Sequence, residues 1–250
     1  MSYSDLKNFC KNNNIDIIYK KKISSTMDIA KKMTPKKYKD LLVITDFQTN
    51  GRGRLGNKWI SNKGNIFITL KFFLQKEIYK YPEISILSLI EIKKTLNNLN
   101  IQNVFFKWPN DIYINDDKVG GILTEIYNYK SKNYCLLGIG INLVKSPKIN
   151  NYKTTYLHQY NNSIKKFLLI ESLVKNIVLN FNIWKKHKNI NLIKDYKKNL
   201  MYFGKKIIIN INNNKSIIGK FIDLTKEGYV IINRKNKKEV VFSGSMDLFK

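Results

Sequence analysis

The chain has 250 residues, of which 43% are hydrophobic, and a formal net charge of +27. This length is enough for one large domain, or for one domain with a smaller companion. Two Cys are too few for a disulfide framework or a zinc cluster, and without an apolar run of 18 uncharged residues no membrane-spanning helix is expected. Because the first residues lack the apolar stretch of a secretory signal, we expect a cytoplasmic protein.

The basic charge by itself would suggest a nucleic-acid-binding protein. Lys is spread along the whole chain, however, and Asn and Ile are similarly abundant, as in the segment 208–218, IININNNKSII. Such a pattern is typical of a genome-wide composition bias and not of a binding face. We therefore expect no specific DNA binding. A non-enzymatic nucleic-acid-binding protein remains the alternative that specific binding at physiological salt would favour.

The first hundred residues predict an alternation of helices and strands. Helical periodicity marks 4–13, 26–33 and 83–98, whereas strand patterns mark 15–19, 41–47 and 66–74. Ser24 or Ser25 can cap the second helix, which has Asp28 in its first turn. The free N–H groups at that helix start suit an anion, but a capped helix without a ligand explains these residues equally well.

Residues 104–128 predict an interrupted strand and a hairpin. Pro109 cannot donate a ladder hydrogen bond, so the strand at 104–114 is interrupted there. A tight turn at 115–117 then makes 111–128 a hairpin.

The next strand, 133–143, carries Gly138 and Gly140 on one face, which lets something large lie against it. We expect an exposed sheet edge at this strand, along which a homodimer could pair.

In the C-terminal part of the chain, the sequence pattern changes from one typical of helices to one typical of strands. Helices are expected at about 163–186 and 189–199, and they are followed by four short strands, KKIIININ, SIIGKFIDL, GYVIINR and EVVFSGS, roughly ten residues apart. This spacing predicts a small all-β barrel. We therefore place a boundary near residue 202, between a domain at 1–202 and a barrel at 203–250.

The segment 48–59 reads QTNGRGRLGNKW. Only three of the 45 basic residues are Arg, and Arg52 and Arg54 alternate here with glycines. Arg offers a planar fork to phosphate or carboxylate, and Gly lets the backbone approach a ligand closely. We interpret the segment as an anion-binding loop, and a surface turn with incidental charge is the alternative.

The glycines of this loop also fit the pattern G-x-G-x-x-G. The loop joins two strands, whereas the dinucleotide-binding fingerprint opens a helix. The catalytic motifs that accompany a kinase glycine loop are absent from the sequence. Both interpretations are therefore rejected.

Four blocks occur in a fixed order: SSTM at 24–27, QTNGRGRLGNKW at 48–59, KWPNDIYINDDKVGGILTE at 107–125 and GIGINL at 138–143. Together they resemble the biotin protein ligase (biotin–[acetyl-CoA-carboxylase] ligase) family in its short form without a DNA-binding domain. The resemblance implies an α+β fold, with a central mixed β-sheet flanked by helices as in class II aminoacyl-tRNA synthetases, followed by an SH3-like barrel. A ligase for lipoate or octanoate on a related fold is the alternative.

The activity implied by the resemblance has two steps. Biotin is activated with ATP and Mg²⁺ to biotinyl-5′-AMP, and the biotinyl group then passes to a lysine of the biotin carboxyl carrier protein of acetyl-CoA carboxylase. No metal ligand from the protein is predicted.

The resemblance also implies roles for individual residues. The predicted biotin- and nucleotide-binding residues are Ser25, Thr26, Met27, Gln48, Gly51, Arg52, Gly53, Arg54, Trp59, Lys118, Gly121 and Asn142. The predicted catalytic residues are Lys107, Arg54 and Lys118, which would direct positive charge at phosphates and the biotin carboxylate, and Asp111, which would orient or deprotonate the carrier lysine. Structural roles remain open for Trp59 as a core aromatic, for Asp111 as a hairpin carboxylate and for Asn142 as a cap.

Three positions depart from the family pattern. Met27 stands where Asn is usual, and Leu55 and Asn57 stand where an Arg is common. The first change removes a polar contact from the biotin pocket, and the other two remove positive charge from the loop. We expect the loop to be a mobile lid, and these changes put tight retention of the adenylate in doubt.

Overall fold

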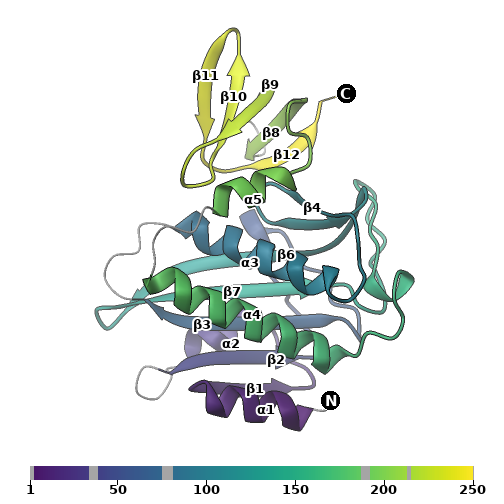
Figure 1. Ribbon diagram of the computed structural model, residues 1–250, viewed down its shortest axis with the longest axis vertical. Helices are drawn as coiled ribbons and strands as arrows, with labels where there is room; N and C mark the ends of the chain where they lie inside the picture. Colours follow the sequence, from purple (N-terminus) through teal and green to yellow (C-terminus); the bar gives the residue numbers. More distant parts are fainter. Residues whose placement is uncertain (1–2, 34–38, 75–80, 187–191, 213–214, 250) are drawn as a thin grey trace.

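The structure, a computed structural model, describes residues 3–33, 39–74, 81–186, 192–212 and 215–249, which form two β-sheets (Figure 1). The larger sheet has the strand order β1-β2-β3-β7-β6-β5-β4, in which β1 and β2 are parallel and the other neighbours are antiparallel. Its strands are β1 (Ile15–Lys20), β2 (Asp40–Thr45), β3 (Ile66–Leu74), β4 (Val104–Lys107), β5 (Asp111–Ile114), β6 (Asp117–Tyr129) and β7 (Lys132–Ile141).

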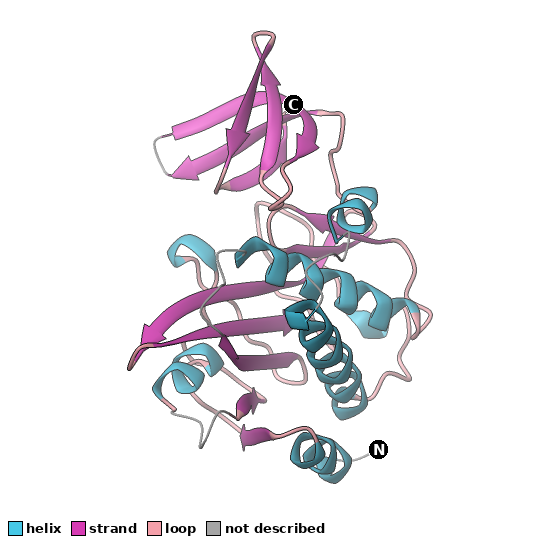
Figure 2. Cartoon of the chain, turned by 60° about the vertical axis from the view of Figure 1, so that its left-hand side comes forward, coloured by secondary structure: helices cyan, strands magenta, loops and turns pink. Residues whose placement is uncertain are grey.

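Helices cover the two faces of the large sheet unequally (Figures 1 and 2). One face packs against the helices α1 (Tyr3–Asn12), α3 (Tyr81–Asn97) and α4 (Lys166–Lys186), and the other packs against α2 (Thr26–Lys32). Strand β2 shows why both faces are apolar: Leu42 joins the core under α1, α3 and α4, and its neighbour Leu41 joins the cluster under α2. The mixed sheet flanked by helices agrees with the expected fold class.

Among the described residues, one helix, α4, is long and apolar enough to cross a membrane by length and composition. Its apolar residues have another explanation, because they form a stripe that is buried in the core. The buried residues are Leu169, Ile170, Leu173, Val174, Ile177, Val178, Phe181 and Trp184. The helix is therefore the core helix of the larger sheet.

Strand β7 lies in the interior of the sheet. It pairs with β3 on one side and with β6 on the other, so both of its hydrogen-bonding edges are used. The expected exposed edge at 133–143 is therefore wrong, and that edge is not available to a second copy of the chain. The error arose because a strand buried on both faces has the same sequence pattern at the edge of a sheet and at its centre.

The second sheet is antiparallel, with the order β11-β10-β9-β8-β12, and is consistent with a small SH3-like barrel. Its strands are β8 (Lys206–Asn212), β9 (Lys215–Leu224), β10 (Val230–Arg234), β11 (Lys237–Val241) and β12 (Ser245–Leu248). The expected four strands are thus five. Gly244, with φ of 147°, separates β11 from β12 where the sequence predicted one continuous strand.

A short helix, α5 (Leu192–Lys198), precedes the barrel. The first residues of the expected helix at 189–199 lie outside the described ranges. Between α5 and the barrel, Phe106 of β4 pairs with the chain around Leu200, because its N–H donates to Asn199 O at 2.8 Å. The barrel is thereby attached next to β4 and β5, which are the strands that carry the KWPND block.

Candidate functional site

A cavity of about 460 Å³ opens on the α2 side of the sheet. It is lined by segments far apart in the sequence, including the start of α2, the glycine-arginine loop, β5, β6, β7 and the barrel strand β12. The predicted site residues among its lining are Thr26, Met27, Gln48, Arg52, Gly53, Arg54, Trp59, Lys107, Asp111, Lys118 and Gly121. The fold therefore brings most of the predicted residues to one place.

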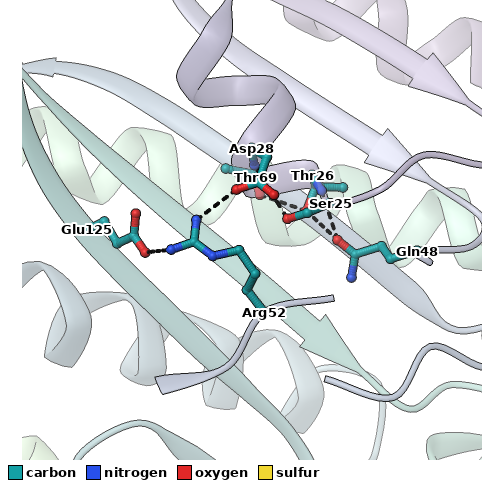
Figure 3. Close-up of polar contacts among 7 residues, drawn as sticks. All are labelled: Ser25, Thr26, Asp28, Gln48, Arg52, Thr69 and Glu125. Atoms are coloured by element: carbon teal, nitrogen blue, oxygen red, sulfur yellow. Dashed lines mark hydrogen bonds and ion pairs between the residues drawn. The ribbon is translucent and has the colours of Figure 1, made fainter. Parts of the chain in front are cut away.

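The start of α2 is tied to the beginning of the loop by the Gln48 side chain (Figure 3). Gln48 Oε1 accepts hydrogen bonds from Thr26 N at 2.8 Å and from Thr26 Oγ1 at 3.1 Å, and Thr69 Oγ1 donates to Thr26 Oγ1 at 2.8 Å. Ser25 does not line the cavity, because its buried hydroxyl is the N-cap and accepts from Asp28 N at 3.4 Å. Thr26 and Gln48 are thus the polar groups at this end of the cavity, and Ser25 agrees with the structural interpretation.

Two glycines on neighbouring strands leave room for the Trp59 ring to lie directly against the sheet. Gly121 on β6 pairs directly with Gly140 on β7. A Cβ added at Gly140 would lie 2.6–2.8 Å from atoms of the Trp59 indole, and one added at Gly138 would lie 2.8 Å from Met27 Sδ. The large groups predicted to lie against this strand are therefore Trp59 and Met27, and any side chain at either glycine would displace them.

The indole N–H of Trp59 has no hydrogen-bond partner among the described residues. Its Nε1 is buried and makes no hydrogen bond within the part of the chain that the structure describes. A buried, unsatisfied donor is costly unless something binds it. Because Trp59 also lines the cavity, this N–H is a candidate contact for a ligand acceptor.

The KWPND block places Lys107 and Asp111 opposite each other. The two residues are paired at the end of the hairpin between β4 and β5, around a turn that contains a cis Trp108-Pro109 peptide bond. Asn110 braces this turn, since its Nδ2 donates to Ile122 O at 2.7 Å. Both charged side chains line the cavity.

Lys118 is a third charged residue beside Lys107 and Asp111 in the cavity lining. Its Nζ lies 2.7 Å from Asp111 Oδ2, 5.7 Å from the Trp59 ring centroid and 5.3 Å from that of Tyr152. Lys107 is paired as well, with Asp247 of the barrel strand β12. Lys107 and Lys118 are therefore held by carboxylates, in positions where an anionic ligand could take over part of each pairing.

The two loop arginines are held by different parts of the molecule. Arg52 reaches from the loop to Asp28 on α2, at 2.9 Å, and to Glu125 on β6 (Figure 3). Arg54 instead donates to the barrel, to Gly244 O at 2.9 Å and to Ser243 Oγ at 3.2 Å. The loop thus connects the larger sheet and α2 with the barrel, and both arginines line the cavity.

Besides Ser25, two predicted residues are not part of the cavity lining. Gly51 is needed for close backbone approach, since an added Cβ would lie 2.5 Å from Trp59 O. The buried Asn142 side chain donates from Nδ2 to Thr155 O at 3.1 Å and accepts at Oδ1 from Asn65 Nδ2 at 3.3 Å. The structure therefore favours the structural alternative for Asn142.

Several lining residues were not predicted from the sequence. Among them are Asn151 and Tyr152, in an irregular segment after β7, and Ser245 and Asp247 on β12. The irregular segment has no periodic pattern, and β12 is far from the other motifs in sequence. Only the fold reveals that these residues belong to the site.

Within the described ranges, no group of three or more His, Cys, Asp and Glu side chains is arranged to hold a metal ion. The two carboxylates of the cavity, on Asp111 and Asp247, are each bound to a lysine. A cation at this site would therefore be held mainly by its ligand's own oxygens.

Comparison with known proteins gives a consistent result. Residues 19–142 match the biotin/lipoate A/B protein ligase family. The bifunctional ligase/repressor BirA of Bacillus subtilis (strain 168) is 32% identical over 134 residues, which cover 52% of this chain and 41% of that protein. Biotin--protein ligase 2 of Arabidopsis thaliana is 25% identical over 231 residues, 86% of this chain and 68% of that one. The chain spans about two fifths of the length of the BirA proteins that it matches.

Among solved structures, the biotin protein ligase from Aquifex aeolicus in complex with biotin and ATP has a TM-score of 0.78 to this chain at 25% identity. The superposition covers 94% of this chain and 99% of the Aquifex chain, so it includes both sheets.

Proposed function

The chain belongs to the biotin/lipoate A/B protein ligase family, and we propose that it activates biotin with ATP and transfers it to a lysine of the biotin carboxyl carrier protein of acetyl-CoA carboxylase. The observation that carries the proposal is the cavity itself. Its lining combines two environments: glycines, an aromatic ring and a Thr26–Gln48 pair on the one hand, and the cations Lys107, Lys118 and Arg54 on the other. An acid with an apolar body and a nucleotide phosphate together require these two environments.

Biotin would bind against the glycines, with its ring system toward α2. There, Met27 and Trp59 supply apolar surface over Gly138 and Gly140, while Thr26 and Gln48 supply polar groups for the ureido end. Met27 in place of the usual Asn gives this end more apolar surface and one fewer hydrogen-bonding side chain.

Adenylation would take place beside Lys118. A carboxylate oxygen of biotin attacks the α-phosphorus of ATP, an acyl–O–P bond forms, and the bond to pyrophosphate breaks. Negative charge accumulates on the phosphate oxygens, so fixed cations stabilise the transition state more than the ground state. Lys118 is 13% exposed, and the low local dielectric strengthens its interaction with an anion.

Transfer would follow in the same cavity. The amine of the carrier lysine attacks the acyl carbon, a C–N bond forms, and AMP leaves with the electrons of the C–O bond. Asp111 lines the cavity, and its carboxylate can orient the amine or accept its proton once Lys118 is engaged by the adenylate. We propose that Mg²⁺ enters with ATP, bound by the phosphate oxygens.

The test is to mix the protein with biotin and Mg-ATP and to look for biotinyl-adenylate by mass spectrometry. Addition of a carrier domain should then produce a biotinylated lysine, with AMP and pyrophosphate as products. Lipoate offered in parallel is the control for the related ligase activity. Transfer of lipoate alone, or no adenylate from either acid, would sink the proposal.

A further inference from the structure

The barrel forms part of the cavity wall. Ser245 and Asp247, both on β12, line the cavity together with residues of the large sheet. The same barrel segment accepts the two hydrogen bonds from Arg54, at Gly244 O and Ser243 Oγ. Two of the cations assigned above to phosphate stabilisation, Arg54 and Lys107, are therefore bound to a short stretch of the C-terminal barrel.

The Lys107–Asp247 pair is unequal in its exposure. The Lys107 side chain is 9% exposed, whereas that of Asp247 is 48% exposed. Burial of an ammonium group is costly without a counter-charge, and a flexible four-carbon side chain has many other rotamers to adopt. Asp247 supplies the counter-charge, and as a cavity residue itself it holds the ammonium at the wall.

We propose that Asp247 is a positioning residue that fixes Lys107 Nζ for nucleotide phosphate, so that the barrel is a structural part of the adenylation site. This inference rests on the proposed function. The role of Asp247 is indirect, since it acts by orienting Lys107, and the carboxylate is not required to contact the substrate.

A second ion pair between barrel and body provides a matched control. Lys197 of α5 and Asp223 of β9 lie 2.8 Å apart, with side chains 35% and 50% exposed, and neither residue lines the cavity. Loss of Asp223 removes a barrel-to-body contact of similar chemistry without touching Lys107. Any effect that is specific to Asp247 must therefore arise at the cavity.

The experiment is a double-mutant cycle on Lys107→Ala and Asp247→Ala, measured by pyrophosphate release with biotin and Mg-ATP. We expect Asp247→Ala to lower kcat by about 10- to 100-fold, because a misplaced group at the reacting centre costs that much. The double variant should lose no more than Lys107→Ala alone, since the two residues act as a unit. Asp223→Ala should stay close to wild type, and Asp247→Glu should recover part of the rate.

Additive losses of kcat in the cycle would overturn the inference. An equal loss of kcat in Asp223→Ala would also overturn it, because the contact between barrel and body would then be merely structural. Thermal unfolding of each variant shows whether it is folded. The same cycle read in the Kd for Mg-ATP needs no turnover, so it decides the inference independently. Absence of adenylate from the wild-type chain would count against the proposed function, whereas wild-type turnover with an additive cycle would count against the role of Asp247 alone.

Discussion

Lys71 and Lys107 are both buried, 2% and 7% exposed as whole residues, but they lie in regions that give a positive charge different partners. Lys107, at the cavity, is paired with the carboxylate of Asp247. Lys71, on β3 under the C-terminal end of α2, donates to Met33 O and lies 4.6 Å from the ring centroid of Tyr134. Burial lowers the pKa of Lys71 from its ordinary 10.5 to about 8.

The fold holds the cations of the cavity differently from this buried lysine. Lys71 is buried against a carbonyl oxygen and aromatic rings, and this burial lowers its pKa. At the cavity, Lys107, Lys118 and Arg52 each have a carboxylate partner. A cation that is paired in this way is held in one orientation, and it can exchange its partner for an anionic substrate.

The largest effect is expected from substitution of Lys118, a paired lysine of the cavity. We expect Lys118→Ala to fold normally and to slow adenylation by about 10²–10³-fold, because a preorganised charged donor in a dry site is worth that much. Pyrophosphate release measures the rate. Lys71→Met is the matched control, since it removes a buried lysine away from the cavity, and it should retain activity. An unchanged rate in Lys118→Ala would refute the assignment.

At Lys71 the expected effect is on stability. The folded chain releases the Lys71 proton near pH 8, whereas the unfolded chain keeps it to about 10.5, so unfolding binds a proton between these values. Stability therefore rises with pH across this window through Lys71, by about 1–3 kcal/mol. We expect the free energy of unfolding of the wild type, measured relative to Lys71→Met in urea, to increase from pH 8 to pH 10. A difference that is constant over this range contradicts the interpretation of Lys71.

The smallest effect is expected at Arg52. Its pairs with Asp28 and Glu125 are partly exposed, so the loss of each is worth about 1 kcal/mol or less. Arg52→Ala should open the loop, with amide hydrogen exchange at 51–58 faster by about fivefold and with earlier escape of the adenylate.

The third arginine of the chain is the control for this loop experiment. Arg234 pairs with Glu239 at 3.7 Å on the barrel, and Arg234→Ala should leave exchange in the loop unchanged. The lid prediction itself is tested in the wild type by adding biotin and ATP. Equal protection of 51–58 with and without these ligands would show that the loop does not close over them.

Local patterns predicted the elements well. The cap at Ser25, the break at Pro109 and the crowding above Gly138 and Gly140 are all present, because each depends on neighbouring residues or on the alternation of one strand. The position of a strand within the sheet could not be predicted from the sequence in the same way. Strand β7 has the pattern of any doubly buried strand, and nothing in its residues showed that it is central.

For the site, the sequence identified the blocks but not their partners. Lys107 was predicted from KWPND, yet its carboxylate comes from residue 247, and Arg54 was predicted from the loop, yet its acceptors lie at 243 and 244. Such contacts depend on how the barrel is placed, and they leave no periodic pattern along the chain. Asp247 has no local feature that distinguishes it from a solvent-exposed strand residue.

The attachment of Lys107 to β12 has a consequence for the order in which the protein matures. The two partners are 140 residues apart in the chain. At a synthesis rate of 5–20 residues per second, a ribosome needs roughly 7–28 s to pass from one to the other. The last strand of the larger sheet, β7, ends at Ile141, so the sheet is fully synthesised within that interval and before the barrel strand exists. During this interval Lys107 is present but Asp247 is not. The cavity lining becomes complete only when β12 docks.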